Sequence, residues 1–169
     1  FPICLDTNDV DEIVETVKNI APTFGGINLE DISAPRCFEI ERRLQEELDI
    51  PVFHDDQHGT AIVVSAGIIN ALRVVNKKIE DAQIVINGAG IAICRMLMNM
   101  GSENIILVDK IGAICENMNG LNSEQEKMSK ITNRDGKTGS LADVMQDADV
   151  FIGVSAPNIV TKEMVESMA

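Results

Sequence analysis

An apolar segment that runs directly into a glycine turn limits most strongly what this chain can fold into. Residues 84–87 are apolar except for the last, Gly88-Ala89-Gly90 follow, and residues 91–100 have the composition of a helix. A second apolar segment, 104–108, ends at Asp109. Strands that are apolar along their whole length are typical of parallel sheets covered on both faces. This order predicts the β-α-β unit of a Rossmann-like, doubly wound parallel sheet.

The glycine turn also predicts a nucleotide site, because its backbone N–H groups and the next helix N-terminus can contact a pyrophosphate. The expected cofactor-binding residues of the turn are Gly88, Ala89, Gly90 and Ile91. The third glycine of G-x-G-x-x-G is absent, since position 93 is Ile93. Asp109 is placed to accept hydrogen bonds from ribose hydroxyls, which favours NAD over NADP, although Lys110 beside it weakens that preference. The alternative is a glycine turn that only reverses the chain.

The residues before this unit predict part of a second α/β unit. Apolar segments at 3–5, 24–29 and 50–53 are expected strands, and helices are expected after Asp6–Asp9 and from Ala34-Pro35. In the second helix, the charged positions from Glu39 to Glu47, Glu41 among them, are expected to face solvent. Later expected elements are a helix over 60–76 that is buried on most sides, helices near 123–131 and 140–144, and a strand over 150–154. We place the domain boundary so that residues 1–54 form the substrate and metal side and residues 55–169 bind the nucleotide.

Acidic side chains follow two of the expected strands. Glu30 and Asp31 come after one apolar segment, and Asp55 and Asp56 come after the next. Because the carboxyl ends of parallel strands meet at one edge, Glu30, Asp31 and either Asp55 or Asp56 could converge there. Their hard oxygen atoms are the ligands that Mg²⁺ and Mn²⁺ prefer. The alternative for Asp31 and for Asp56 is to cap the helix that follows.

Two histidines, His54 and His58, flank the second acidic pair. Zinc is the less suitable metal, since neither a cysteine nor a third histidine stands in a recognised spacing with them. We expect both imidazoles to form hydrogen bonds that order the loop.

Composition excludes several classes of partner. The net charge is −13, from 27 acidic and 14 basic residues, which argues against nucleic acid or an anionic membrane surface. The chain has no run of about 18 uncharged apolar residues, so no membrane span is predicted. Widely spaced cysteines predict buried thiols in a reducing, cytoplasmic compartment. The chain begins with Phe1 in what reads as the middle of a strand, so we expect a fragment.

Three blocks, FGGINLEDISAPRCFEIERRL, PVFHDDQHGTAIV and DVFIGVSAP, resemble the bacterial-type malic enzymes across essentially the whole chain. The resemblance implies metal-dependent oxidative decarboxylation of L-malate to pyruvate and CO₂ with reduction of NAD or NADP, by a homo-oligomer that we expect to be a dimer. It implies that Glu30, Asp31 and Asp56 bind Mg²⁺ or Mn²⁺. Asp55 matches the acid beside the general-base lysine, and Ala89 and Gly90 match the cofactor loop.

The chain departs from the family pattern in two places. The family's catalytic tyrosine and lysine belong to a segment upstream of what matches Phe1, and this chain has no tyrosine. Members also usually read G-A-G-x-A-G-I-A-I where this chain reads Gly88 to Ile93, three residues shorter. Either the loop is truncated, or residues are missing from it and the numbering has been closed up over the gap; we favour the gap because GIAIC resumes in register.

Two other functions remain open. Another NAD(P)-dependent dehydrogenase of 2-hydroxy acids or amino acids would not need four acids at strand ends, so EDTA sensitivity separates it. A non-catalytic nucleotide-binding module would bind no malate.

Overall fold

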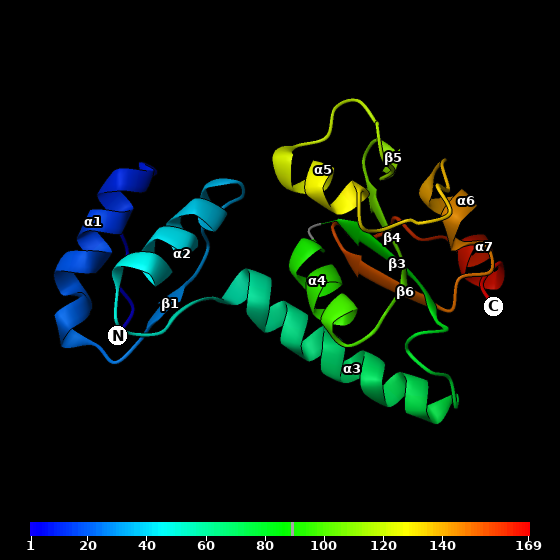
Figure 1. Cartoon of the computed structure of the whole chain (residues 1–169), viewed down its shortest axis with the longest axis horizontal. Coiled ribbons are helices and arrows are strands. Elements are labelled where there is room, and N and C mark those ends of the chain that lie inside the picture. The colour runs from blue at the N-terminus through cyan, green and yellow to red at the C-terminus, as the bar shows by residue number, and fades with distance from the viewer. Residues whose placement is uncertain (89) are drawn as a thin grey trace. The chain divides into compact units, whose positions relative to one another are not determined.

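The structure, a computed structural model, describes residues 1–88 and 90–169. The chain forms two compact units, Phe1–Thr60 and Ala61–Ala169 (Figure 1). The division between them falls after Thr60, at the start of a long helix and a few residues after the boundary expected at 54/55. The domain assignment itself stays a prediction. Among the described residues no helix is both long and apolar enough to cross a membrane.

The first unit places two helices against a two-stranded parallel sheet. Its elements are α1 (Val10–Ile20), η1 (Ala21–Thr23), β1 (Ile27–Leu29), α2 (Arg36–Glu47), β2 (Val52–His54) and the π-helical turn η2 (Asp55–Gly59). The Asp9 carboxylate caps α1 by accepting the N–H of Glu12 at 3.0 Å. Apolar side chains of α1, α2 and both strands then form one core, made of Ile13, Val14, Val17, Leu29, Ile40, Leu44 and Val52.

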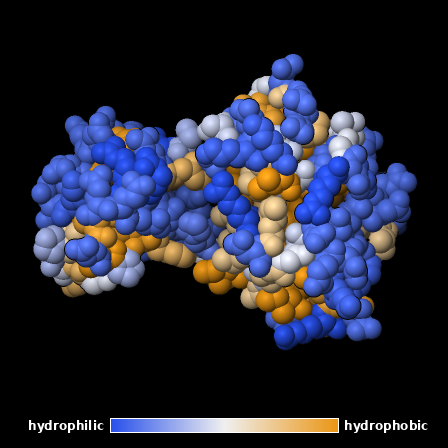
Figure 2. All heavy atoms as spheres, in the orientation of Figure 1, coloured by the Kyte–Doolittle hydropathy of each residue, from blue (hydrophilic) through white to orange (hydrophobic). Residues whose placement is uncertain are grey.

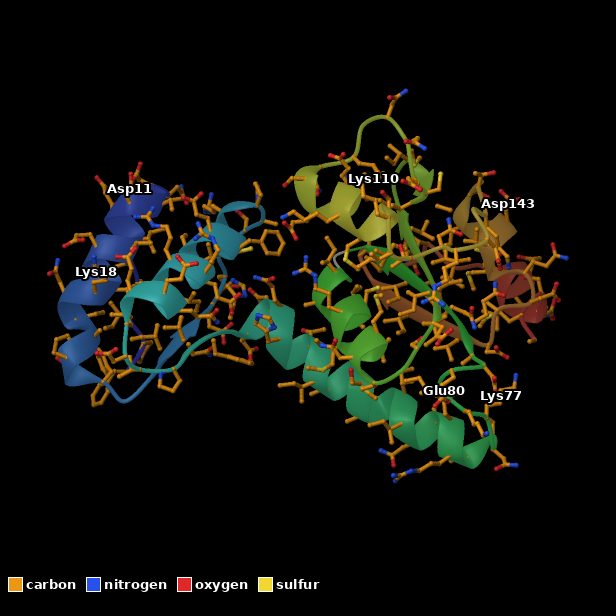
Figure 3. All side chains as sticks on the ribbon, in the orientation of Figure 1. Asp11, Lys18, Lys77, Glu80, Lys110 and Asp143 are labelled. Carbon is orange, nitrogen blue, oxygen red and sulfur yellow. The ribbon has the colours of Figure 1, made fainter. Side chains whose placement is uncertain are left out.

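Ion pairs join α1 and α2 at the surface of this unit. Lys18 Nζ lies 2.7 Å from Glu47 Oε2, and Arg43 Nη1 lies 2.6 Å from Asp11 Oδ1. Figure 3 labels Asp11 and Lys18 along α1. The strand expected at residues 3–5 is wrong, because residues 1–9 form neither helix nor strand. A short apolar segment becomes a strand only where a neighbouring strand pairs with it, and no such pairing is available to this one among the described residues.

The second unit is a doubly wound sheet. Its elements are α3 (Thr60–Val74), β3 (Gln83–Gly88), α4 (Ile91–Asn99), β4 (Asn104–Asp109), β5 (Gly112–Ala113), α5 (Ser123–Ser129), α6 (Leu141–Met145), β6 (Val150–Val154) and α7 (Lys162–Glu166). The sheet has the order β5-β4-β3-β6, in which β3 runs parallel to β4 and to β6, and β5 is an antiparallel edge strand. The predicted β-α-β order and Rossmann-like class are confirmed.

Alternate residues of the central strand face different helical layers. Ile84 and Ile86 pack with residues of α3, α4 and α5, whereas Val85 packs with residues of α6 and α7. All three side chains are fully buried, as expected for a strand covered on both faces.

The long helix α3 is less buried than its composition suggested. Its buried residues, Ala61, Ser65, Ile68 and Leu72, form a single stripe at helical spacing. Ile62, Val63, Ile69 and Val74 on the same helix are exposed. Figure 2 shows apolar side chains gathered over this part of the second unit, on a face that is otherwise mostly hydrophilic.

Candidate functional site

Two parallel strands deliver the acidic residues to one edge of the small sheet. Strand β1 pairs with β2 in a register that places Leu29 opposite His54. Glu30 follows the first of these residues and Asp55 follows the second. Both acidic pairs therefore leave the sheet at the same level, as the sequence predicted.

A hydrogen bond joins the two acidic pairs. The backbone N–H of Asp31 donates to Asp56 Oδ2 at 3.1 Å. Asp31 has a φ of 56°, in the left-handed region, which costs a non-glycine residue about 1 kcal/mol. Asp31 does not cap the helix that follows it, because Pro35 is the N-cap of α2 and no side chain of the described residues caps that helix. The capping alternative is therefore wrong for Asp31, whereas Asp56 lies within the turn η2 and its carboxylate accepts the N–H of Asp31.

The oxygen chemistry of this edge suits a hard divalent cation. Asp56 is exposed, and so is Glu30, whose Oε1 accepts a hydrogen bond from Asn28 Nδ2 at 3.0 Å. Carboxylates with free lone pairs beside water are the surroundings in which Mg²⁺ and Mn²⁺ bind. Within the described residues, no group of three or more His, Cys, Asp or Glu side chains is already arranged around a metal position. The assignment of Glu30, Asp31 and Asp56 as metal ligands stays a prediction.

Asp55 begins the π-helical turn η2, and its side chain lies against the glycine that ends the turn. The N–H of Thr60 donates to the carbonyl of Asp55, five residues earlier, which is the π-helical spacing. A Cβ on Gly59 would lie 2.9 Å from Asp55 Cγ. Only a glycine at this position leaves room for the carboxylate where it lies.

Two side chains of helix α2 contact the residues of η2 that follow Asp56. Nε2 of His58 lies 2.9 Å from Oε1 of Glu41, and Gln57 Nε2 donates to Cys37 Sγ at 3.6 Å. The expectation that Glu41 faces solvent is wrong, since it is only 7% exposed. A glutamate within a charged run reads as a surface residue until its partner is known, and this partner stands 17 residues away.

The two histidines differ in their hydrogen bonding. His58 forms the expected bond, to Glu41. His54 is 1% exposed, and within the described residues neither of its ring nitrogens has a hydrogen-bond partner. The hydrogen bond expected for both imidazoles is therefore confirmed for His58 alone, and the ordering of the loop stays a prediction.

The two described glycines of the turn meet different steric demands. Gly88 has a φ of 99°, and a Cβ there would lie 2.9 Å from Ser155 Cα and from the carbonyl of Val154. Gly90 lies against Ile86, whose Cβ would be 3.5 Å from an added Cβ. Close approach of helix to strand is the role of the third glycine in G-x-G-x-x-G, so Gly90 supplies what Ile93 cannot. Ala89 lies outside the described residues.

The sequence of the glycine loop is three residues shorter than the family pattern. The residue numbers run continuously from 1 to 169, as they would with either a truncated loop or a gap that the numbering had closed up, so the expected gap stays a prediction. Helix α4 begins at Ile91, directly after Gly90, and no side chain from residues 1–88 or 90–169 caps it. Its first backbone N–H groups are therefore available to an anion.

Asp109 is the last residue of β4, next to β3 in the sheet. Its Oδ1 accepts the N–H of Lys110 at 2.7 Å, and its Oδ2 accepts a hydrogen bond from Gln125 Nε2. Gln125 is the N3 residue of the capping box of α5, and its other side-chain atom accepts the N–H of Asn122. The helix cap thus orients the carboxylate predicted to bind ribose.

Asn87, whose role the sequence did not single out, pairs with Ser155 across the carboxyl ends of β3 and β6. Asn87 Nδ2 donates to Ser155 Oγ at 2.8 Å. Asn87 is the polar end of an apolar strand, and that was the available signal. Ligands of open α/β sheets bind at this edge.

Comparison with known proteins matches both units to one family. The family described as "Malic enzyme, NAD binding domain" matches residues 57–169, and "Malic enzyme, N-terminal domain" matches residues 5–45. The chain belongs to the malic enzyme family. The alternatives of another dehydrogenase or a non-catalytic nucleotide module are not favoured.

Relatives of this malic enzyme chain are closely similar but longer. It is 59% identical to an NAD-dependent malic enzyme of Geobacillus stearothermophilus over 172 residues, covering 100% of this chain and 36% of the relative. It is 58% identical to a bifunctional malic/malolactic enzyme of Bacillus subtilis, covering 42% of that protein. The solved NAD-dependent malic enzyme of Thermotoga maritima has a TM-score of 0.96 and 46% identity, over 100% of this chain and 46% of that one. The chain thus spans less than half the length of these relatives.

Proposed function

We propose that the full-length protein containing this chain oxidises L-malate and decarboxylates the product to pyruvate, with NAD or NADP as oxidant and Mg²⁺ or Mn²⁺ as bound metal. In this reaction malate would lose its hydroxyl proton to a base and a hydride from C2 to the bound dinucleotide. The bond from C3 to its carboxylate then breaks, CO₂ leaves, and a proton returns to C3. The observation that carries this proposal is the meeting of Asp31 and Asp56 at one sheet edge, within a chain of the malic enzyme family.

On this proposal, Glu30, Asp31 and Asp56 hold the cation and leave positions for water and substrate. When bound, the cation would lower the pKa of the malate hydroxyl, and the nicotinamide would accept the hydride. Asp55 lies next to the ligand Asp56 and is kept against Gly59, from where it acts on the base supplied by the rest of the protein.

The second unit holds the dinucleotide on this proposal. The uncapped N-terminus of α4 contacts the phosphates after the turn at Gly88 and Gly90. Asp109, already oriented by Gln125, accepts the ribose hydroxyls. A carboxylate there repels a 2′-phosphate, so we propose NAD as the preferred cofactor.

The metal assignment is tested with Asp56→Asn. An asparagine can still accept the N–H of Asp31 through Oδ1, so the fold should persist, whereas a neutral amide is a poorer Mg²⁺ ligand. We expect turnover of the full-length protein to fall to background in the variant, and EDTA to abolish wild-type turnover until Mn²⁺ is added. The exposed acid Asp49 provides the control, since Asp49→Asn should change neither. Full activity of Asp56→Asn at ordinary Mg²⁺ concentrations would contradict the assignment.

The products distinguish two outcomes of the same site. One relative is named a bifunctional malic/malolactic enzyme, so lactate is a possible product besides pyruvate. We expect pyruvate with stoichiometric NADH, measured by chromatography and by absorbance. We further propose a cytoplasmic homo-oligomer, such as a dimer. We also propose that it binds neither nucleic acid nor an anionic membrane, and the net charge of −13 supports this last point.

A further inference from the structure

Helix α2 and the acidic turn η2 are joined by two side-chain contacts that the proposed reaction leaves unexplained. Nε2 of His58 faces both carboxylate oxygens of Glu41, at 2.9 Å from Oε1 and 3.1 Å from Oε2. Gln57 donates from its amide to the sulfur of Cys37. Glu41 and Cys37 are four residues apart on α2 and therefore share one face of that helix.

Glu41 is a buried acid that depends on these contacts. Its side chain is 9% exposed, whereas that of His58 is 40% exposed. A carboxylate taken out of water is costly unless donors satisfy it. His58 is the close donor, and Gln45 Nε2 is a distant one, at 3.5 Å from Oε1. The imidazole must therefore stay over Glu41, which fixes the turn that carries it.

The same turn carries the two acids of the candidate metal site on its other side. Asp56 points to the backbone of Asp31 while its neighbours Gln57 and His58 point to α2. The ring of Phe53, in β2, lies against that of His58 with 5.8 Å between centroids, which limits the rotation of the imidazole. Contacts at two successive residues fix both the position of the turn and its rotation about its own axis.

We propose that Glu41 and His58 are positioning residues: their contact fixes η2 on α2 and thereby sets where the carboxylates of Asp55 and Asp56 lie. The consequence for metal binding rests on the proposed function. The effect of the contact on the turn does not, because it is present whether or not metal is bound. Neither residue is proposed as a ligand. Residues outside the ligand set that orient the ligands commonly change metal affinity by 10–100-fold when they are replaced.

The test uses His58→Ala and Glu41→Ala, singly and together, in the full-length protein. The control is Glu46→Ala, which removes an exposed carboxylate of α2 that pairs with Arg42 on the same helix. Hydrogen exchange of the metal-free proteins is followed for the peptides that contain residues 55–60 and the N–H of Asp31. Binding of Mn²⁺ is measured by electron paramagnetic resonance of the free ion, well below the unfolding temperature of each variant.

We expect faster exchange at residues 55–60 and at Asp31 in both single variants, with helix α1 unchanged, and Mn²⁺ affinity weakened by about tenfold. The double variant should be no worse than either single one, because both remove the same contact. His58→Gln, which keeps an amide donor, should recover part of the affinity. Glu46→Ala should match wild type.

Unchanged exchange at the turn in the single variants would overturn the proposal, and so would additive losses of affinity in the double variant. A different result is that the wild type binds no Mn²⁺ while the variants still exchange faster at the turn. That result would support the contact as the element that orders η2 and would remove the metal from the proposed function. The two failures are therefore distinguishable.

Discussion

Replacing Gly59 by alanine should separate stability from activity. Gly59 ends the π-helical turn η2, and its φ is not in the left-handed region, so an alanine backbone is unstrained there. Alanine is favoured over glycine in a helix by about 0.5–1 kcal/mol. The free energy of unfolding should therefore rise by up to about that amount.

The added methyl group must displace Asp55. An ideal Cβ at position 59 lies 2.9 Å from Asp55 Cγ, and unstrained carbon atoms stay about 3.5–4.0 Å apart. The carboxylate therefore has to move by about 1 Å, which its side-chain rotation allows at little cost. A misplacement of that size at a reacting centre can reduce a rate by about 100-fold. We expect such a fall in turnover of the full-length protein if Asp55 has the role proposed for it.

Gly67, in α3, provides the matched control. A Cβ at Gly67 meets no other atom within 4 Å, so Gly67→Ala should give the same gain in helix stability with unchanged turnover. The measurements are thermal unfolding followed by circular dichroism and the initial rate of NADH formation with Mn²⁺ present. Equal activity of the two variants would refute the placement of Asp55 at the reacting centre, and a large loss of stability in Gly59→Ala alone would refute the steric reasoning.

Three further outcomes test the second unit. Asp109→Ala should weaken NAD binding about tenfold, measured by calorimetry, and leave malate affinity unchanged; equal loss of both would contradict its ribose role. Lys77 pairs with the Asp149 carboxylate, which also accepts the N–H of Gln83 at 2.8 Å, and both contacts hold the pKa of Asp149 below its usual 3.8. The stability that the ionised Asp149 contributes is therefore present above pH 3.8 and is lost as the pH falls through the pKa of the folded protein. At pH 7 the free energy of unfolding of the wild type should therefore exceed that of Asp149→Asn by about 1 kcal/mol. A difference that does not change with pH would show that the charge of Asp149 is not its cause. Burial raises the pKa of the Cys94 thiol to about 12, so mass spectrometry after iodoacetamide treatment should find Cys94 unmodified in the native protein and Cys4 modified.

Hydrophobic periodicity predicted most of the elements, and family-specific blocks predicted the family. The strand that ends at Asn87, the glycine turn and the strand that ends at Asp109 were readable because a strand covered on both faces has to be apolar throughout. The acidic pairs after β1 and β2 were readable because parallel strands present their carboxyl ends at the same edge. The ligand roles of those acids, and the cofactor role of the turn, remain predictions.

The contacts between elements could not be read in the same way. Glu41 looks like any other residue of the charged face of α2, and only the packing of η2 against that helix buries it and supplies His58 as its partner. Capping the next helix was the alternative role for Asp31, whereas a left-handed backbone turns its N–H to Asp56. Gly90 occupies the role of a missing third glycine because the helix it begins lies close to Ile86.

By itself, the sequence determined most of the segments that become strands and helices, the family, and the residue types available at the carboxyl edges, because these follow from local patterns of side-chain chemistry. The tertiary structure decided which carboxylates are buried, which are held and which stay free for a ligand. Those properties depend on desolvation and on donors supplied by residues distant in the chain, and no local pattern encodes them.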